Sequence, residues 1–284
     1  MRGLSALLST RWFVFISILV LLALSFVVRA PLAHIQLPGE RVFAVAGVAI
    51  TNTMLAGALA SLVLVWFGWA ATRKMQEKPA GLQNVAEMVV EGLLGLVEGV
   101  AGRHLGRQFF TLVATIFLFI LTANWMGLLP GFGTIGVWEH EHGETIFVPL
   151  LRSASTDLST TVGLAIISVV MVEYFGVRTL GAKSYLSRFI NFSGPIEFFM
   201  GILETISEIS RIISLSFRLF GNVFAGEVLL TVIGFLVPFV AVLPFYGLEL
   251  FVGAIQAFIF AILTLVFLTL ATIEHGGEGA HGGH

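Results

Sequence analysis

The chain has 284 residues, of which 57% are hydrophobic and 11% charged, and its formal net charge is -2. Soluble domains carry roughly 25% charged residues, so this chain lacks the polar surface of a water-facing domain and is expected to lie in lipid. The near-neutral charge excludes a basic nucleic-acid-binding surface. With no cysteine, the chain has no disulfides, iron–sulfur clusters or thiol nucleophile.

Apolar runs of about 20 residues are long enough to cross a hydrocarbon core of about 30 Å. The sequence contains four apolar stretches at 12–28, 42–71, 109–129 and 158–177, and two longer, mostly apolar stretches at 190–237 and 245–273. The first follows two arginines and fits either an uncleaved helix or a secretory signal peptide. Pro31 after Ala30 makes a poor cleavage site and favours the helix.

The order of these apolar stretches predicts an N-terminal membrane helix or signal anchor at 1–30 and a single membrane domain at 31–284. Between the second and third runs, residues 81–101 are too polar to span. Their apolar side chains fall on one helical side and three glutamates on the other, as in a helix that lies in the membrane interface.

The fifth run, 190–237, would extend about 70 Å as one helix, more than twice the hydrocarbon core. It must therefore tilt, bend or lie partly in the interface, and Pro238 and Pro244 separate it from the sixth. We predict an all-α integral membrane protein with about six membrane helices and one interfacial amphipathic helix. The last two membrane helices are expected to be long and strongly tilted.

Lysine and arginine in short loops set the orientation of a membrane chain. With a cytoplasmic N-terminus, six crossings place ten basic residues inside and only Arg29, Arg41 and Arg152 outside. The polar loop 130–155 then faces outward. Its Glu-His-Glu-His run at 139–142 lacks the spacing of a His-Glu-x-x-His zinc site, so we expect a solvated loop and no bound metal.

Ionisable residues interrupt the fifth run, although each charge at the centre of a membrane helix costs about 2.5–3.5 kcal/mol on insertion scales. They are Glu197, Glu204, Glu208, Arg211, Arg218 and Glu227. Positions 197, 204, 211 and 218 recur every seven residues and form one stripe. Glu227 projects to the opposite side, so the polar path changes face at Arg218.

The orientation also gives the depth of each polar group. Those expected in the outer half are Asn124, Asp157, Glu227 and Glu249, and those in the inner half are Glu204 and Glu208. Gln256 approaches the level of Arg218. An arginine does not release its proton, so Arg218 would separate two half-channels, and a carboxylate on another subunit would have to carry the ion past it.

Several of these residues also have a structural interpretation. Arg211 and Arg218 could form buried ion pairs with glutamates of the same run. Glu173 and Glu197 could be interfacial residues whose carboxylates reach the headgroups. Asp157 could cap the fourth helix.

Residues 216–227, Ser-Phe-Arg-Leu-Phe-Gly-Asn-Val-Phe-Ala-Gly-Glu, resemble the signature of subunit a of F-type ATP synthases. Residues 256–260, Gln-Ala-Phe-Ile-Phe, resemble the second signature of that family, and the similarity runs from about 43 to 275. The resemblance implies that Arg218 faces the essential carboxylate of a rotating c-subunit ring, with Asn222 and Gln256 beside it. It also implies an outer half-channel of Asn124, Asp157, Glu227 and Glu249, and an inner one that contains Glu204. Where some members pair Glu with His, this chain has Glu at both 227 and 249, so these carboxylates are expected to titrate as a coupled pair.

The function that the resemblance implies is that of a proton-translocating stator subunit without catalytic chemistry or a cofactor. Its expected partners are the c-subunit ring, b-type peripheral stalk subunits, the rest of the F-type complex and membrane lipid. The expected location is a bacterial plasma membrane. A self-contained proton-coupled secondary transporter is the alternative, although no internal repeat is visible, and a structural scaffold is a second. Sodium in place of the proton stays open, because ion selectivity would lie on the rotor subunit.

Overall fold

The computed structural model describes residues 39–45, 47–141, 144–189, 194–237 and 241–272, together with positions 12, 13, 15–17, 20 and 21. Within this part of the chain, five helices are long and apolar enough to cross a membrane. They are α2 (Asn52–Thr72), α3 (Leu82–Gly127), α4 (Leu158–Leu180), α6 (Pro195–Leu236) and α7 (Val242–Thr272). The chain is a multi-pass membrane protein. Most of the expected first helix and the tail from 274 onward lie outside the described residues.

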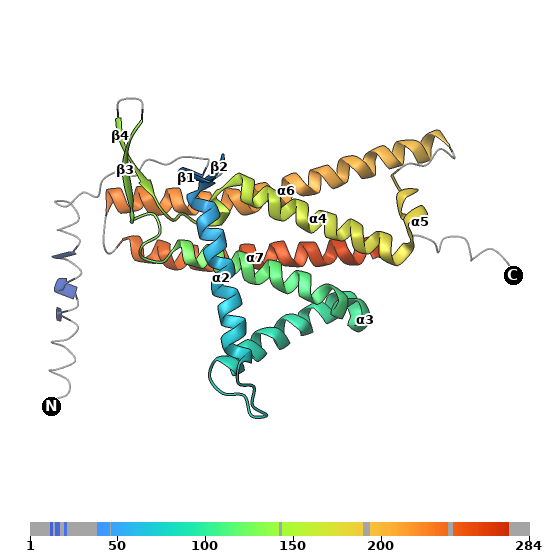
Figure 1. The fold of residues 1–284 in the computed structure, drawn as a ribbon, viewed down its shortest axis with the longest axis horizontal. Coiled ribbons are helices and arrows are strands. Elements are labelled where there is room, and N and C mark those ends of the chain that lie inside the picture. The colour runs from blue at the N-terminus through green and yellow to red at the C-terminus, as the bar shows by residue number, and fades with distance from the viewer. Residues whose placement is uncertain are drawn as a thin grey trace.

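The long helices lie side by side in one elongated bundle. Figure 1 shows α4, α6, α7 and the second half of α3 running along the length of the molecule, whereas α2 crosses them steeply. Helix α7 packs against α3, α4 and α6, and α4 also packs against α6. With 42 residues, α6 is about 60 Å long. Its length is thus twice the thickness of the hydrocarbon core, as the apolar run predicts.

Helix α3 consists of two segments that meet at a kink. Gly102 has φ 76° and ψ 162° inside the helix, a conformation that favours glycine. The first segment corresponds to the amphipathic helix expected at 81–101, and the second to the span expected at 109–129. Across the kink, the exposed side chain of Arg107 lies 3.1 Å from Glu98.

The start of the second apolar run is not helical, which corrects the expectation of a membrane helix from residue 42. Strands β1 (Arg41–Val45) and β2 (Val48–Thr51) form an antiparallel hairpin that turns at Gly47, where φ is 85°. Branched residues favour strands, and the left-handed turn suits glycine. Helix α2 begins only at Asn52, because the Thr51 hydroxyl accepts the amide hydrogen of Met54 and caps the helix.

The loop between α3 and α4 and the connection after α4 also contain short elements that no sequence pattern predicts. Strands β3 (Gly136–Glu141) and β4 (Glu144–Pro149) pair as a second hairpin, followed by the 3-10 turn η1 (Ala154–Thr156). Helix α5 (Ala182–Leu186) follows α4. The side chains at 139–146 lie outside the described residues, so the expectation of a metal-free loop stays untested.

Three hydrophobic clusters of described residues hold the bundle together, and the smallest joins α2, α3 and η1 through Ala60, Ala123 and Ala154. Another joins α3, α4 and α7 through residues such as Phe109, Val172 and Leu265. The third adds α6, with Ile120, Leu215 and Leu219 among its members. Because α6 contributes only part of its circumference to these clusters, the opposite side stays exposed, including Ile206, Ile213 and Phe217.

Buried polar contacts join the elements at the end of the bundle that carries the two hairpins, which is the end expected to face outward. The Asn52 side chain donates to Glu40 Oε2 at 3.2 Å and to the carbonyl of Pro149 at 3.1 Å. The hydroxyl of Thr53 donates to Asp157 Oδ2 at 2.9 Å. The other oxygen of Asp157 caps α4 by accepting the amide hydrogen of Ser159. These contacts connect α2, the outer loop and α4.

We predict that Thr53→Val lowers the apparent free energy of unfolding of the full-length chain by about 1–3 kcal/mol, because a buried carboxylate oxygen loses its donor. Thr72→Val in the same helix is the matched control: its exposed hydroxyl donates only within α2, and we expect a change near zero. Denaturation of the two purified variants in detergent measures the difference. Equal stabilities would show that the Thr53–Asp157 contact contributes little.

Candidate functional site

A cavity of about 440 Å³ lies at the end of the bundle that carries the two hairpins, where α3, the β4–η1 loop, α6 and α7 meet. Three residues expected in the outer half line it: Asn124, Glu227 and Glu249. Two further charged residues, Glu40 and Arg152, also line it and were not expected there. Three of the four polar groups expected in the outer half thus share one space with Arg152, from the loop before η1, and Glu40, which directly precedes β1.

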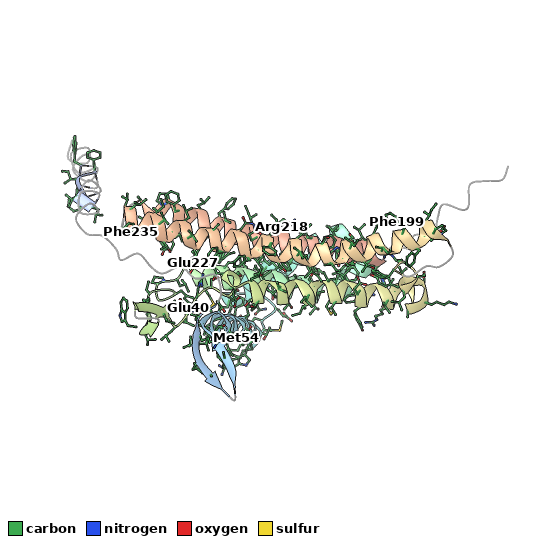
Figure 2. All side chains as sticks on the ribbon, turned by 90° about the horizontal axis from the view of Figure 1, so that it is seen from above. Glu40, Met54, Phe199, Arg218, Glu227 and Phe235 are labelled. Carbon is green, nitrogen blue, oxygen red and sulfur yellow. The ribbon has the colours of Figure 1, made fainter. Side chains whose placement is uncertain are left out.

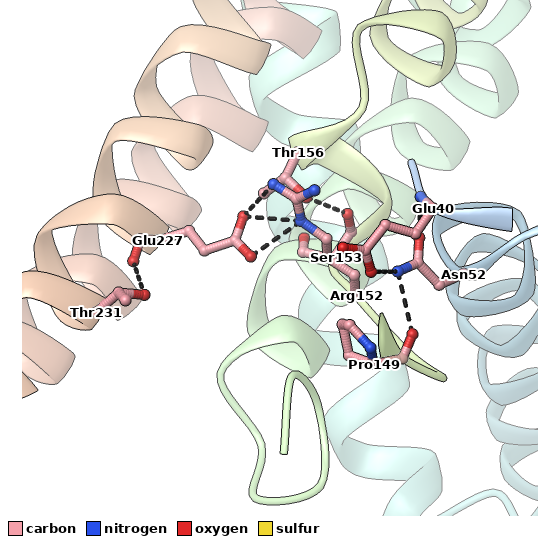
Figure 3. Close-up of polar contacts among 8 residues, drawn as sticks. All are labelled: Glu40, Asn52, Pro149, Arg152, Ser153, Thr156, Glu227 and Thr231. Carbon is pink, nitrogen blue, oxygen red and sulfur yellow. Dashed lines mark hydrogen bonds and ion pairs between the residues drawn. The ribbon is translucent and has the colours of Figure 1, made fainter. Parts of the chain in front are cut away.

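Glu227 forms an ion pair with Arg152 in this cavity. Arg152 Nε lies 2.9 and 3.1 Å from the two carboxylate oxygens, and Nη2 lies 2.9 Å from Oε2 (Figure 3). The arginine side chain is only 5% exposed. Its guanidinium also lies 5.8 Å from the ring centre of Phe224, one turn before Glu227. A charged group that is buried this deeply requires such a partner.

Glu249 lies against the same turn of α6 but in different surroundings. Its carboxylate contacts the backbone of Gly226 so closely that a side chain at 226 would overlap it. The residue is 8% exposed, and none of the described cations lies within ion-pair distance of it. The two glutamates therefore approach the cavity from neighbouring helices, one paired with an arginine and the other packed on backbone.

Asn124 joins α3 to α7 beside the two glutamates. Its amide nitrogen donates to the carbonyl of Gly253 at 3.0 Å. Its buried oxygen has no hydrogen-bond partner among the described residues. Asp157 does not line the cavity. Instead it receives hydrogen bonds from Thr53 and the α4 backbone, which is the capping role considered above.

Arg218 lies on the exposed side of α6. Figure 2 shows it midway between Phe199 and Phe235, whereas Glu227 lies on the side of the helix that faces Glu40. Its Nη2 contacts Ser214 Oγ at 3.4 Å, and no carboxylate among the described residues lies within ion-pair distance. Asn222, also exposed, donates to the Arg218 carbonyl at 2.8 Å. Gln256 is 7% exposed within α7.

Two glutamates near the other end of α6 form ion pairs with arginines. Glu204 lies 2.9 Å from Arg188, and Glu208 lies 2.6 Å from Arg211, the local pair that their spacing permits. Arg211 also covers the ring of Phe267 at 4.2 Å. The structure thus gives Arg211, unlike Arg218, a carboxylate and an aromatic ring as partners.

Glu173 and Tyr185 form a further contact at this end. The two side chains interact, and one carboxylate oxygen of Glu173 is buried without a partner among the described residues. The Tyr185 ring packs against Gly176, where a side chain would overlap it. Burial, and then the nearby Glu173 charge, raise the pKa of Tyr185, which keeps its hydroxyl protonated as a donor. Glu173 therefore points into the bundle here and not toward the interface.

Residues 53–269 match the family model described as ATP synthase A chain. The chain belongs to this family. It is 38% identical over 224 residues to "ATP synthase subunit a" of Campylobacter jejuni subsp. doylei, an alignment that covers 78% of this chain and 89% of the relative. The protein of the same name from Helicobacter pylori strain P12 is 36% identical with the same coverage. That from Moorella thermoacetica is 32% identical over 235 residues, covering 83% of this chain and 96% of the relative.

Sequence reasoning missed Arg152 as a site residue because it entered only the count of outer positive charges. The signal available was a lone arginine after the apolar residues 148–151, directly before a small polar segment that leads into a membrane helix. Glu40 and Tyr185 were missed because their partners, Asn52 and Glu173, are separated from them by 12 residues in each case. Neither spacing follows a helical repeat that would signal the contact.

We predict that Gly226→Ala lowers the apparent free energy of unfolding by about 1–3 kcal/mol through overpacking against Glu249. Gly163→Ala in α4 meets nothing within 4 Å and is expected to be neutral or stabilising by up to about 1 kcal/mol through helix propensity.

Denaturation of the full-length variants in detergent tests this contact, with the double variant Gly226→Ala/Glu249→Ala completing the cycle. The decrease in unfolding free energy that the added methyl group causes should largely disappear when the Glu249 side chain is removed. If the decrease persists in the double variant, the added methyl group overlaps atoms other than those of Glu249.

Proposed function

We propose that this chain is the stator subunit of an F-type ATP synthase that conducts protons through two offset half-channels against a rotating c-subunit ring. The observation that carries the proposal is Arg218, an arginine on an exposed face of a membrane helix with no described carboxylate partner. Because an unpaired charge in a membrane is costly, the side chain requires a carboxylate beyond this chain. The membership of the ATP synthase A chain family supports that reading.

The outer half-channel corresponds to the cavity with Asn124, Glu227 and Glu249. The inner half-channel would begin at the polar end that contains Glu204 and Glu208. Arg218 lies between the two along α6, and it does not relay a proton because it stays protonated. A proton that enters from outside must therefore transfer to a carboxylate on the ring, travel with it and leave on the other side of Arg218.

Each element of this proposal has a distinct chemical role. Arg218 favours the ionised form of the ring carboxylate as it passes, and Asn222 and Gln256 flank the transfer region. The membrane potential contributes about 2.3 kcal/mol per charge per 100 mV. This chain performs no covalent chemistry, since the nucleotide reaction belongs to other subunits of the complex.

The partners follow from the same assignment. The c-subunit ring would cover the exposed face of α6, where Ile206, Ile213 and Phe217 lie beside Arg218. The b-type peripheral stalk would hold this chain against rotation, and the complex would lie in a bacterial plasma membrane. A self-contained secondary transporter is the alternative, but such a protein would need to compensate Arg218 within its own fold.

We predict that Arg218→Ala reduces ATP-driven proton pumping to background in membrane vesicles that contain the assembled complex. The reason is that nothing then separates the two half-channels or ionises the passing carboxylate. Arg107→Ala removes an exposed arginine that pairs only with Glu98 at the surface, and we expect nearly normal pumping. Near-normal pumping by Arg218→Ala would show that the arginine is structural and would favour the transporter.

A further inference from the structure

We propose that Arg152 is a positioning residue that holds Glu227 as a fixed, charge-balanced anchor and thereby leaves Glu249 to bind and release the transported proton. This inference rests on the proposed function, and it assigns different roles to the two glutamates of the outer half-channel. The observations behind it are the unequal surroundings of two glutamates that line the same cavity. Neither the family match nor the spacing of the residues distinguishes the two.

The contact between Arg152 and Glu227 is a bidentate ion pair that fixes the Glu227 carboxylate. Both carboxylate oxygens accept from the guanidinium at 2.9–3.1 Å, a planar arrangement that fixes orientation as well as distance. The Arg152 side chain is 5% exposed and that of Glu227 is 35% exposed, so removing Glu227 would leave the buried arginine charge uncompensated. A carboxylate held in this way is poorly suited to take up and release protons repeatedly.

The loop that carries Arg152 is itself fixed to the bundle. The hydroxyl of Ser153 donates to the carbonyl of Ala123 in α3 at 3.3 Å. The carbonyl of Pro149 accepts from Asn52 of α2 at 3.1 Å, as Figure 3 shows beside the ion pair. Thr156 donates back to the Ser153 carbonyl at 2.8 Å. Arg152 therefore approaches α6 from a rigid support on two other helices.

Glu249 has no such cation among the described residues and lies against the Gly226 backbone. The other charged or titratable groups that line the cavity are Glu40, Arg152, Glu227 and Tyr246. Glu40 accepts from Asn52, and Arg152 contacts Glu227. Glu249 is thus the cavity carboxylate that can take a proton from cavity water, pass it to the ring carboxylate and return to its ionised form.

The test is passive proton flux, measured against outer pH, in vesicles that contain the complete membrane sector. Arg152→Gln should lower the flux roughly tenfold and shift its half-maximal point to higher pH by about one unit, because a nearby positive charge no longer opposes proton binding. Arg152→Lys should keep the wild-type midpoint. Arg41→Gln, which removes an exposed arginine of the first hairpin, is the matched control and should leave flux and midpoint unchanged.

The double variant Arg152→Gln/Glu227→Gln decides between the two glutamates. It should regain flux to within a few-fold of wild type with the midpoint restored, whereas Glu249→Gln should abolish flux. If the double variant stays as impaired as Arg152→Gln, Glu227 itself carries the proton and the proposal is wrong. It is equally wrong if Arg152→Gln lowers flux by a constant factor at every pH, because that result indicates a purely structural tie.

Two further outcomes are also decisive. If Arg152→Gln does not assemble, the double variant and Glu249→Gln answer the question alone: a conducting double variant with a silent Glu249→Gln supports the proposal, and the reverse overturns it. Arg218→Ala, measured in the same membranes, tests the proposed function separately. Normal pumping there would remove the stator assignment whatever the Arg152 series shows.

Discussion

Charge compensation within the membrane is the constraint on which the arrangement around α6 depends. Three glutamates of this helix each contact an arginine, and the three arginines come from different places: the segment after α5, α6 itself and the loop before η1. Arg218 has no carboxylate among the described residues. Because an unpaired charge is costly in lipid, Arg218 is, under the proposed function, the point at which this chain pairs with a carboxylate of another subunit.

The remaining fold supports these pairs by bringing helices into close contact. Gly226 allows the Glu249 carboxylate to reach the α6 backbone, and Gly253 allows Asn124 to approach α7. Small residues have this effect in membrane bundles generally, since helices there associate through packing and polar contacts. The two outer hairpins and the α2 start then close the outer end, so that Arg152 reaches α6 from a fixed direction.

The sequence predicts the parts of this architecture that follow from local patterns. Long apolar runs give α4, α6 and α7, and the change from amphipathic to apolar composition marks the two halves of α3, which meet at Gly102. The contact between Glu208 and Arg211 follows from their spacing. The hairpin at 41–51 was not predicted, because its residues are as apolar as a membrane helix and only the turn at Gly47 distinguishes them. The ion pair between Arg152 and Glu227 joins residues 75 positions apart, and no local pattern records such a contact.

Depth along the helices predicts the level of the polar groups but not their chemical state. Glu227 and Glu249 were expected at the same level, and both line one cavity. Their difference arises from a loop arginine and a glycine, which depth alone does not reveal. Two equivalent carboxylates would share a proton as a coupled pair. Under the proposed function, the ion pair of Glu227 with Arg152 leaves Glu249 as the one carboxylate that binds the proton. The outer side would then deliver protons singly to the ring, and Arg218 would determine where each one must leave this chain.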